Sequence, residues 1–380
     1  HLLGEVEVVF GFWAMVLVMF LALHDGPASA MNYLEGQSFR EAAFIFVIMV
    51  IAASRPVLDF AAALLNWLSR LLPIAPSAAY YVTILSIGPL LGSFITEPAA
   101  MTLAAMLLRQ RYFSKQAPAF FKYATIGVLF VNVSVGGTLT PFAAPPVLMV
   151  AERWSWDFAF MLQAFGWKAT LVVLTNAVAA TILLRKHLAQ LPRGSGHLER
   201  LETPWSIIAI HLALLAGVVL ASHYTVVFIG LFLFFLGFAE AYRRHQNGLI
   251  LREGLLVAFF LAGLVVLGGM QEWWLQPLLA GMGSTTLYYG ATLLTSVTDN
   301  AALTYLGSLV DGLPAEAQYA LVAGAVSGGG LTVIANAPNP AGYSILKGSF
   351  DQAAISPLWL AVAATPPTLV AVAAFQLLPG

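Results

Sequence analysis

The sequence predicts an all-helical, polytopic membrane protein, and three observations lead to that prediction. Sixty per cent of the 380 residues are hydrophobic and only 9% are charged, whereas about 25% of the residues of an ordinary globular protein are charged. The mean hydropathy is +0.85. Apolar runs long enough to cross a bilayer recur along the whole chain. This composition excludes a soluble enzyme, a nucleic-acid-binding protein and, since the chain has 0 cysteines, a secreted disulfide scaffold.

The individual elements follow the apolar runs, because a helical span needs about 20 apolar residues. We expect about nine full spans, at 5–24, 40–55, 120–152, 158–187, 204–222, 224–241, 253–270, 316–347 and 355–378. Two further runs, 78–109 and 284–311, are too long for one span and are interrupted in the middle, so each predicts a re-entrant hairpin. The segment 57–72 mixes apolar residues with Asp59 and Arg70, and we expect it to lie along the membrane interface.

Basic residues are distributed unequally between the loops, which predicts an orientation. If the loop 110–122 is cytoplasmic, alternation of the spans places 14 of the 17 Lys and Arg residues on that side. The opposite side receives only Arg40 and Arg153. Since cytoplasmic loops carry an excess of Lys and Arg, we expect the N-terminus and the loop 188–203 to be cytoplasmic as well, and the loop 311–316 to be external.

Two pairs of similar segments occur in the same order in both halves of the chain. Residues 96–102 read Thr-Glu-Pro-Ala-Ala-Met-Thr, and residues 298–304 read Thr-Asp-Asn-Ala-Ala-Leu-Thr. Residues 136–146 begin Gly-Gly-Thr-Leu-Thr, and residues 328–338 begin Gly-Gly-Gly-Leu-Thr. The loop after the first acidic tip is basic and the loop after the second is acidic, so the two copies are expected to face opposite ways. Inverted repeats with interrupted helices are typical of secondary transporters.

The repeats divide the chain into three parts. We expect a first inverted repeat, a cytoplasmic linker with a connecting span, and a second inverted repeat, at 1–187, 188–223 and 224–380. The connecting span adds one more crossing of the membrane, which the second repeat needs in order to have the opposite orientation. Each repeat is expected to contain one hairpin and one broken helix, at 78–109 and 120–152 in the first and at 284–311 and 316–347 in the second.

The breaks predict a polar site within the membrane. Gly and Pro cost about 1 and 3 kcal/mol in a helix interior, and both are concentrated in 136–146 and 328–340. Non-helical backbone at membrane depth is tolerated only where it is buried in protein or lines a water-filled cavity. The four interruptions are therefore expected to converge on one site that offers hydroxyl, amide and carbonyl oxygens. The candidates for ion binding or cavity lining are Thr96, Thr298, Asn300, Gly137, Thr138, Thr140, Gly330, Thr332, Asn336, Asn339, Asn132 and Ser134.

Two carboxylates, Glu97 and Asp299, lie at the predicted tips of the hairpins, in equivalent positions of the two repeats. An acidic side chain at the bilayer centre costs about 2.5–3.5 kcal/mol on insertion scales and is a functional candidate by default. A carboxylate that exchanges a proton for a cation is the minimal machinery of an antiporter. We expect Asp299 to be the main carrier and Glu97 its symmetry mate. The alternative is a structural pairing, for example with Lys168, which is either a charge partner or a snorkelling residue.

At these motifs the chain resembles the ion transporter superfamily, whose members pair a re-entrant hairpin with a broken helix in each inverted repeat. Residues 298–300, Thr-Asp-Asn, and residues 136–141, Gly-Gly-Thr-Leu-Thr-Pro, are similar to segments of NhaD-type sodium/proton antiporters and arsenite-pump permeases. Residues 88–98 are more similar still to a bacterial group of sodium/proton antiporters. The resemblance implies a bacterial inner-membrane protein with a scaffold that forms a homodimer and a transport domain that moves as an elevator.

Two departures from the family pattern bear on the substrate. The first tip has Glu97-Pro98 where the family usually has Asp-Asn, and neither tip has the Ser-Asn-Thr of the dicarboxylate branch. No arginine lies near a break to hold a carboxylate substrate, whereas two acids do. We therefore expect exchange of Na⁺ or Li⁺ for H⁺, with no cofactor and no nucleic-acid partner.

Two alternatives remain open from the sequence. One is a sodium-coupled carrier of an anion or metalloid, such as a carboxylate or arsenite, with the same fold. The other, from a different class, is a membrane-embedded enzyme. Against the enzyme, the sequence has no His-rich metal motif, no Gly-x-Ser-x-Gly turn and no nucleotide-binding loop.

Overall fold

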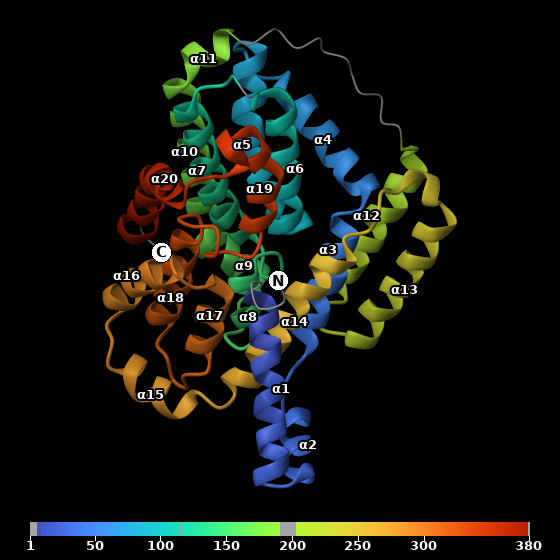
Figure 1. Cartoon of the computed structure of the whole chain (residues 1–380), viewed down its shortest axis with the longest axis vertical. Coiled ribbons are helices and arrows are strands. Elements are labelled where there is room, and N and C mark those ends of the chain that lie inside the picture. Colours follow the sequence, from blue (N-terminus) through green and yellow to red (C-terminus); the bar gives the residue numbers. More distant parts are fainter. Residues whose placement is uncertain (1–5, 115, 191–202, 379–380) are drawn as a thin grey trace.

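All regular elements of the described residues are helices. The computed structural model describes residues 6–114, 116–190 and 203–378. In Figure 1, α12 and α13 lie at one side of the molecule and α16, α18 and α20 at the other. Lys115 and, in the predicted loop 188–203, Arg193 and Arg200 lie outside the described residues.

Five helices form a peripheral group, which consists of α1 (Val6–His24), α3 (Arg40–Ala52), α12 (Trp205–Leu220), α13 (Thr225–Ala241) and α14 (Leu251–Gly268). Helix α3 packs against α12, α13 and α14, and α14 packs along α1. A methyl group on Gly263 would collide with backbone atoms of Phe10 and Gly11. The contact between α1 and α14 therefore depends on small residues, which let helix backbones approach closely within a membrane.

Three further helices adjoin members of this group along the chain. Helix α4 (Arg55–Ser69) follows α3 after a bend of 64°, so the predicted interfacial segment 57–72 does form a helix of its own; its position at a membrane surface stays a prediction. Helices α2 (Pro27–Glu35) and α15 (Glu272–Ala280) were not expected from the apolar runs. Helix α15 carries the exposed side chain of Trp273.

The interruptions predicted within 78–109 and 284–311 are confirmed. Helices α5 (Pro76–Ile95) and α6 (Glu97–Arg111) are joined at Thr96 and pack against each other. Helices α16 (Ser284–Thr295) and α17 (Asn300–Ser308) are separated by residues 296–299. The first pair differs from a symmetrical hairpin, because α5 alone has the length and hydropathy of a membrane span.

Both runs predicted to be broken helices are interrupted in the structure, while their role as broken membrane spans stays a prediction. The first consists of α7 (Ala119–Gly136), a 3-10 turn (Gly137–Leu139) and α8 (Pro145–Ala151), and the second of α18 (Ala315–Gly328) and α19 (Asn339–Leu346). Residues 140–144 and 329–338 are not helical. Helix α7 packs against α5, α10, α18 and α20.

The remaining apolar runs form α9 (Phe158–Met161), a π-helical turn (Leu162–Gly166), α10 (Trp167–Leu183), α11 (Arg185–Gln190) and α20 (Pro357–Leu377). By length and composition, the described residues contain 5 helices able to cross a membrane, or 6 if α3 and α4 together form one bent span. Helices α12 and α13 are apolar but shorter, as is the described apolar part of α1. The chain is thus an all-helical membrane protein, while the count of nine spans and two hairpins stays a prediction.

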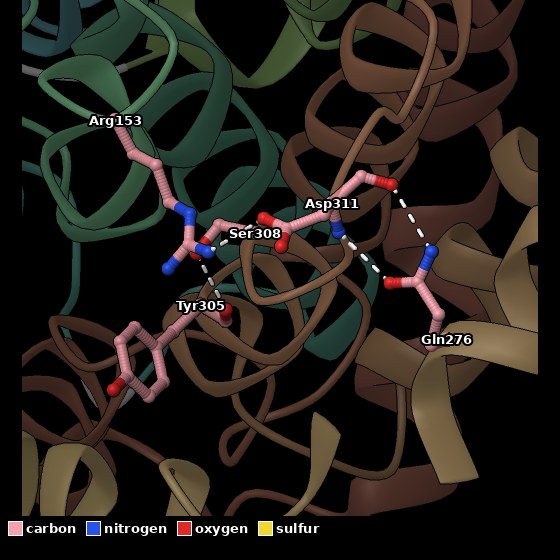
Figure 2. A network of polar contacts seen from close by, with 5 residues as sticks. All are labelled: Arg153, Gln276, Tyr305, Ser308 and Asp311. Atoms are coloured by element: carbon pink, nitrogen blue, oxygen red, sulfur yellow. Dashed lines mark hydrogen bonds and ion pairs between the residues drawn. The ribbon is translucent and has the colours of Figure 1, made fainter. Parts of the chain in front are cut away.

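A polar network joins the end of α8 to the loop between α17 and α18 (Figure 2). Arg153 donates to Asp311 Oδ1 at 3.3 Å. The side chain of Gln276, on α15, accepts from the Asp311 backbone N–H at 2.9 Å and donates to its carbonyl oxygen at 3.1 Å. Helices α15 and α11 lie at opposite ends of the molecule in Figure 1. Arg153 and the loop 311–316 therefore share one end, as expected of two external features, although their side of the membrane stays a prediction.

Candidate functional site

The Glu97 carboxylate lies at the centre of the candidate site. Glu97 is the first residue of α6 and its side chain is 0% exposed. Its Oε2 accepts a hydrogen bond of 2.9 Å from the Nδ2 of Asn336, which belongs to the second break. Its Oε1 is buried and has no hydrogen-bond partner among the described residues. The tip of the first hairpin thus meets the broken helix of the other half.

Gly137 brings the first break to the same carboxylate. A methyl group built on Gly137 would collide with the Oε1, Cγ and Cδ atoms of Glu97. The residue has φ −75° and ψ −5°, which other amino acids adopt without strain. A glycine is therefore required here for the close approach of Glu97 and not for the backbone conformation.

Thr96 turns the chain at the hairpin tip in a strained conformation. Its φ of 74° and ψ of 149° lie in a region that is nearly restricted to glycine and costs about 1–3 kcal/mol for other residues. Its hydroxyl is buried and has no hydrogen-bond partner in the described part of the chain. Strain of this kind persists where the surrounding structure enforces it, and it is concentrated at functional sites.

Three asparagines of the second half, of which Asn336 contacts Glu97, have side-chain oxygens without a partner among the described residues. The Oδ1 atoms of Asn300, Asn336 and Asn339 are buried and have no partner among the described residues. Gly329 connects them, because its carbonyl accepts from Asn339 Nδ2 at 2.8 Å and a methyl group on it would lie 3.0 Å from Asn300 Nδ2. The backbone N–H of Asn300 donates to Ala335 O at 3.1 Å. The start of α17 is thereby fastened to the second break.

Asp299 is placed differently from Glu97, although the two occupy matched positions in sequence. Asp299 is the N-cap of α17, and its Oδ1 accepts from the backbone N–H groups of Ala301 at 2.8 Å and Ala302 at 3.1 Å. Its side chain is half-buried. The residue after it, Asn300, donates its backbone N–H to the carbonyl oxygen of Ala335, the neighbour of the Asn336 that contacts Glu97. The sequence ranked Asp299 first, whereas burial and the free oxygen atom favour Glu97.

The polar side chains of the first break form hydrogen bonds with backbone groups of the protein. Thr138 donates to Val135 O at 2.8 Å, and Thr140 donates to Ser93 O at 2.6 Å. Ser93, a residue that the sequence analysis missed, also donates from its hydroxyl to Gly136 O at 2.7 Å and accepts from the Leu139 N–H at 2.9 Å. The first hairpin is thus tied to the first break by hydrogen bonds that leave few groups for a ligand.

The two predicted residues that precede this break are structural in their contacts. Asn132 donates to Leu85 O at 2.8 Å and to Val173 O at 3.1 Å, and its Oδ1 accepts from Asn176. Ser134 donates to Val326 O at 2.8 Å. These bonds hold α7 against α5, α10 and α18.

The assembled groups suit a small cation or a proton. A carboxylate oxygen and amide oxygens are hard acceptors, which is the ligand type that hard cations prefer. The described residues contain no group of three or more His, Cys, Asp or Glu that could hold a metal ion. The site offers the negative charge of the Glu97 carboxylate together with neutral amide oxygens.

Comparisons with known proteins give the family of the chain. A family model described as "Putative Na+/H+ antiporter" matches residues 1–378. The chain belongs to this family. One similar solved structure is that of the Alcanivorax borkumensis YdaH transporter, with a TM-score of 0.46, 14% sequence identity, and coverage of 98% of this chain and 97% of that one. No curated protein matches the chain.

The other predicted residues of this antiporter-family chain lie at the edge of the site or outside it. Thr298 is exposed, and its hydroxyl donates to Leu294 O at 2.8 Å. Thr332 donates to Ser296 O at 2.8 Å and so ties the second break to the end of α16. Gly330 lets the second break approach the backbone of Val131.

Lys168 is buried, and in the described part of the chain its ammonium group contacts Tyr319 and not Glu97. Its Nζ donates to the Tyr319 hydroxyl at 2.8 Å and lies 4.8 Å from the centre of that ring. The Tyr319 hydroxyl in turn donates to Phe375 O at 3.2 Å. Lys168 thus links α10, α18 and α20, and an ammonium over an aromatic face gains about 0.5–2 kcal/mol.

Proposed function

We propose that the protein exchanges Na⁺, or the smaller Li⁺, for H⁺ across a membrane. The observation that carries this proposal is the Glu97 carboxylate, which is fully buried, has one unpartnered oxygen and takes part in no ion pair among the described residues. A buried charge without a partner is costly, so the site is expected to hold either a proton or a cation. Since one carboxylate accepts one or the other, the two ions compete, and this competition couples their transport.

Helix contacts support an architecture of two inverted repeats. Helix α5 packs against α7, as α16 packs against α18 in the other half. Helix α6 packs against α19, and α17 packs against α8, so that each hairpin meets the broken helix of the other repeat. This exchange of partners is the arrangement expected of two intertwined copies around a midplane site.

Alternating access would follow from movement of the hairpins and broken helices against the peripheral group. A cavity of about 440 Å³ lies between the two, lined by Arg40 and Phe44 of α3, by Pro141 and Phe142 of the first break, and by Glu152. It supports a route from the predicted external side to the break. An elevator movement, a homodimeric assembly and a location in the bacterial inner membrane are part of this proposal and derive from the family resemblance.

Exchange can be measured directly with purified protein in liposomes that contain a pH-sensitive dye. We expect an imposed Na⁺ gradient to drive proton movement in the opposite direction, and Li⁺ to do so as well, with K⁺ much less effective. The apparent Na⁺ affinity should fall as the pH is lowered, because ligands must be deprotonated before they bind a metal ion. Proton flux that requires arsenite or a dicarboxylate together with Na⁺ would instead support an anion carrier.

Orientation can be tested by cysteine labelling, because the chain has 0 cysteines of its own. We expect a cysteine at position 186, in α11, to react from the cytoplasmic side, and one at position 316, at the start of α18, to react only from outside. Both side chains are exposed. If a membrane-impermeant reagent labels both positions from the same side, the inverted orientation of the two repeats is wrong.

A further inference from the structure

The two halves are unequal at the candidate site, although their motifs match. The three amide residues of the second half are replaced in the first half by side chains without an oxygen atom: Asn300 by Pro98, Asn336 by Ala144 and Asn339 by Val147. All six residues are buried. Ala144 and Val147 belong to the apolar core of the protein. A carboxylate that approached the first break would therefore find no amide of the kind that Glu97 finds in the second.

The two acidic side chains make different contacts, as this difference between the halves predicts. Glu97 reaches across to Asn336 and leaves Oε1 unpartnered. Asp299, which lies on the element packed against α8, directs its Oδ1 to the N–H groups of its own helix. The symmetry mate of the Glu97–Asn336 contact would be a contact from Asp299 to Ala144, which has no polar side-chain atom to offer.

The buried polar atoms without a hydrogen-bond partner are also distributed unequally between the two breaks. Around the tips and breaks, the buried side-chain atoms that lack a partner among the described residues belong to Thr96, Glu97, Thr295, Asn300, Asn336 and Asn339. None of them comes from the first break, where Thr138 and Thr140 form hydrogen bonds, and Ser93 of α5 is hydrogen-bonded to this break. Thr295 lies beside the second break, because a methyl group on Gly328 would approach its Cβ at 3.1 Å.

We propose that each chain has a single monovalent-cation site instead of a symmetrical pair, and that the site is shared between the halves. The first half supplies the charge, through Glu97, and the second half supplies neutral oxygens, through Asn336, Asn300 and Asn339. Asp299 is then a neighbouring negative charge that caps α17 and is not a ligand. This inference rests on the proposed function. It adds the number of cation sites in each chain to the identity of the exchanged ions.

The first test is the stoichiometry of sodium binding to the purified full-length protein, measured by isothermal titration calorimetry with NaCl at constant ionic strength. We expect one Na⁺ per chain, and a Hill coefficient of 1 for the Na⁺ dependence of proton flux in liposomes. Two Na⁺ per chain, or a Hill coefficient near 2, would overturn the single site while leaving Na⁺/H⁺ exchange intact. No sodium binding and no exchange would overturn the proposed function and the single site together.

Two pairs of variants test the shared ligand set. Asn336→Ala should lower the Na⁺ affinity about tenfold or more. Val147→Ala, which truncates the α8 residue that matches Asn339, should leave the affinity within about twofold. Asp299→Asn keeps an N-cap residue of good quality and should still bind one Na⁺, while Glu97→Gln should bind none. Retained binding in Glu97→Gln together with lost binding in a folded Asp299→Asn protein would overturn the assignment. A tryptophan-fluorescence melting curve for each variant separates lost binding from lost folding.

Discussion

Replacement of Glu97 by glutamine should abolish sodium-driven proton flux in liposomes. Glutamine keeps the length of the side chain and an oxygen that can accept the hydrogen bond from Asn336 Nδ2, which is 2.9 Å in the native protein. It removes the only titrating group of this contact, so neither the proton nor the charge that holds the cation remains. Because a neutral amide costs less to bury than an unpaired charge, the variant should be at least as stable as the native protein.

A matched control separates this effect from a general loss of acidic residues. Glu316 lies exposed at the start of α18, away from the tips and the breaks, and Glu316→Gln should exchange the two ions at the native rate. Native exchange by a folded Glu97→Gln protein would remove Glu97 from the transport cycle. In that case Asp299, the acid that the sequence ranked first, would become the remaining carboxylate candidate.

The different positions of Glu97 and Asp299 have a physical cause that the similarity of the two motifs does not indicate. Aspartate is among the best N-cap residues, because its short side chain reaches the N–H groups of the next turn. Asp299 does this for Ala301 and Ala302. Glutamate is a poor cap, and Glu97 instead begins α6, so its longer side chain extends to the other half of the protein. The motifs match residue by residue, but the helices begin one residue apart.

The helix breaks could be predicted from the sequence, since glycine and proline act locally on the backbone. Gly137, Pro145 and Pro146 place the first interruption within a few residues of its observed position. The contact between Glu97 and Asn336 could not be predicted in this way, because it joins residues 239 positions apart and depends on how the halves intertwine. The role of Ser93 was missed for a similar reason: a serine within an apolar run gives no sign that it faces a break in another helix.

The largest effect of a change outside the carboxylates is expected from Gly137→Ala. The added methyl group would meet the Glu97 carboxylate, so the side chain must move away from Asn336. Alanine tolerates the backbone conformation of residue 137, with φ −75°, and favours helix by about 1 kcal/mol relative to glycine. The expected result is a folded protein whose sodium-driven proton flux is reduced about a hundredfold, since a displacement of about 1 Å at a reacting group can cost that much.

Gly237→Ala, in α13, provides the control for Gly137→Ala, because nothing lies within 4 Å of a methyl group at that position. It should melt at the same or a slightly higher temperature and exchange ions at the native rate. A second variant tests the cause directly. In the double variant Gly137→Ala with Glu97→Asp, the shorter carboxylate makes room for the methyl group, so flux should recover in part relative to Gly137→Ala alone. If Gly137→Ala exchanges at the native rate with unchanged Na⁺ affinity, the close approach of the first break to Glu97 has no part in transport.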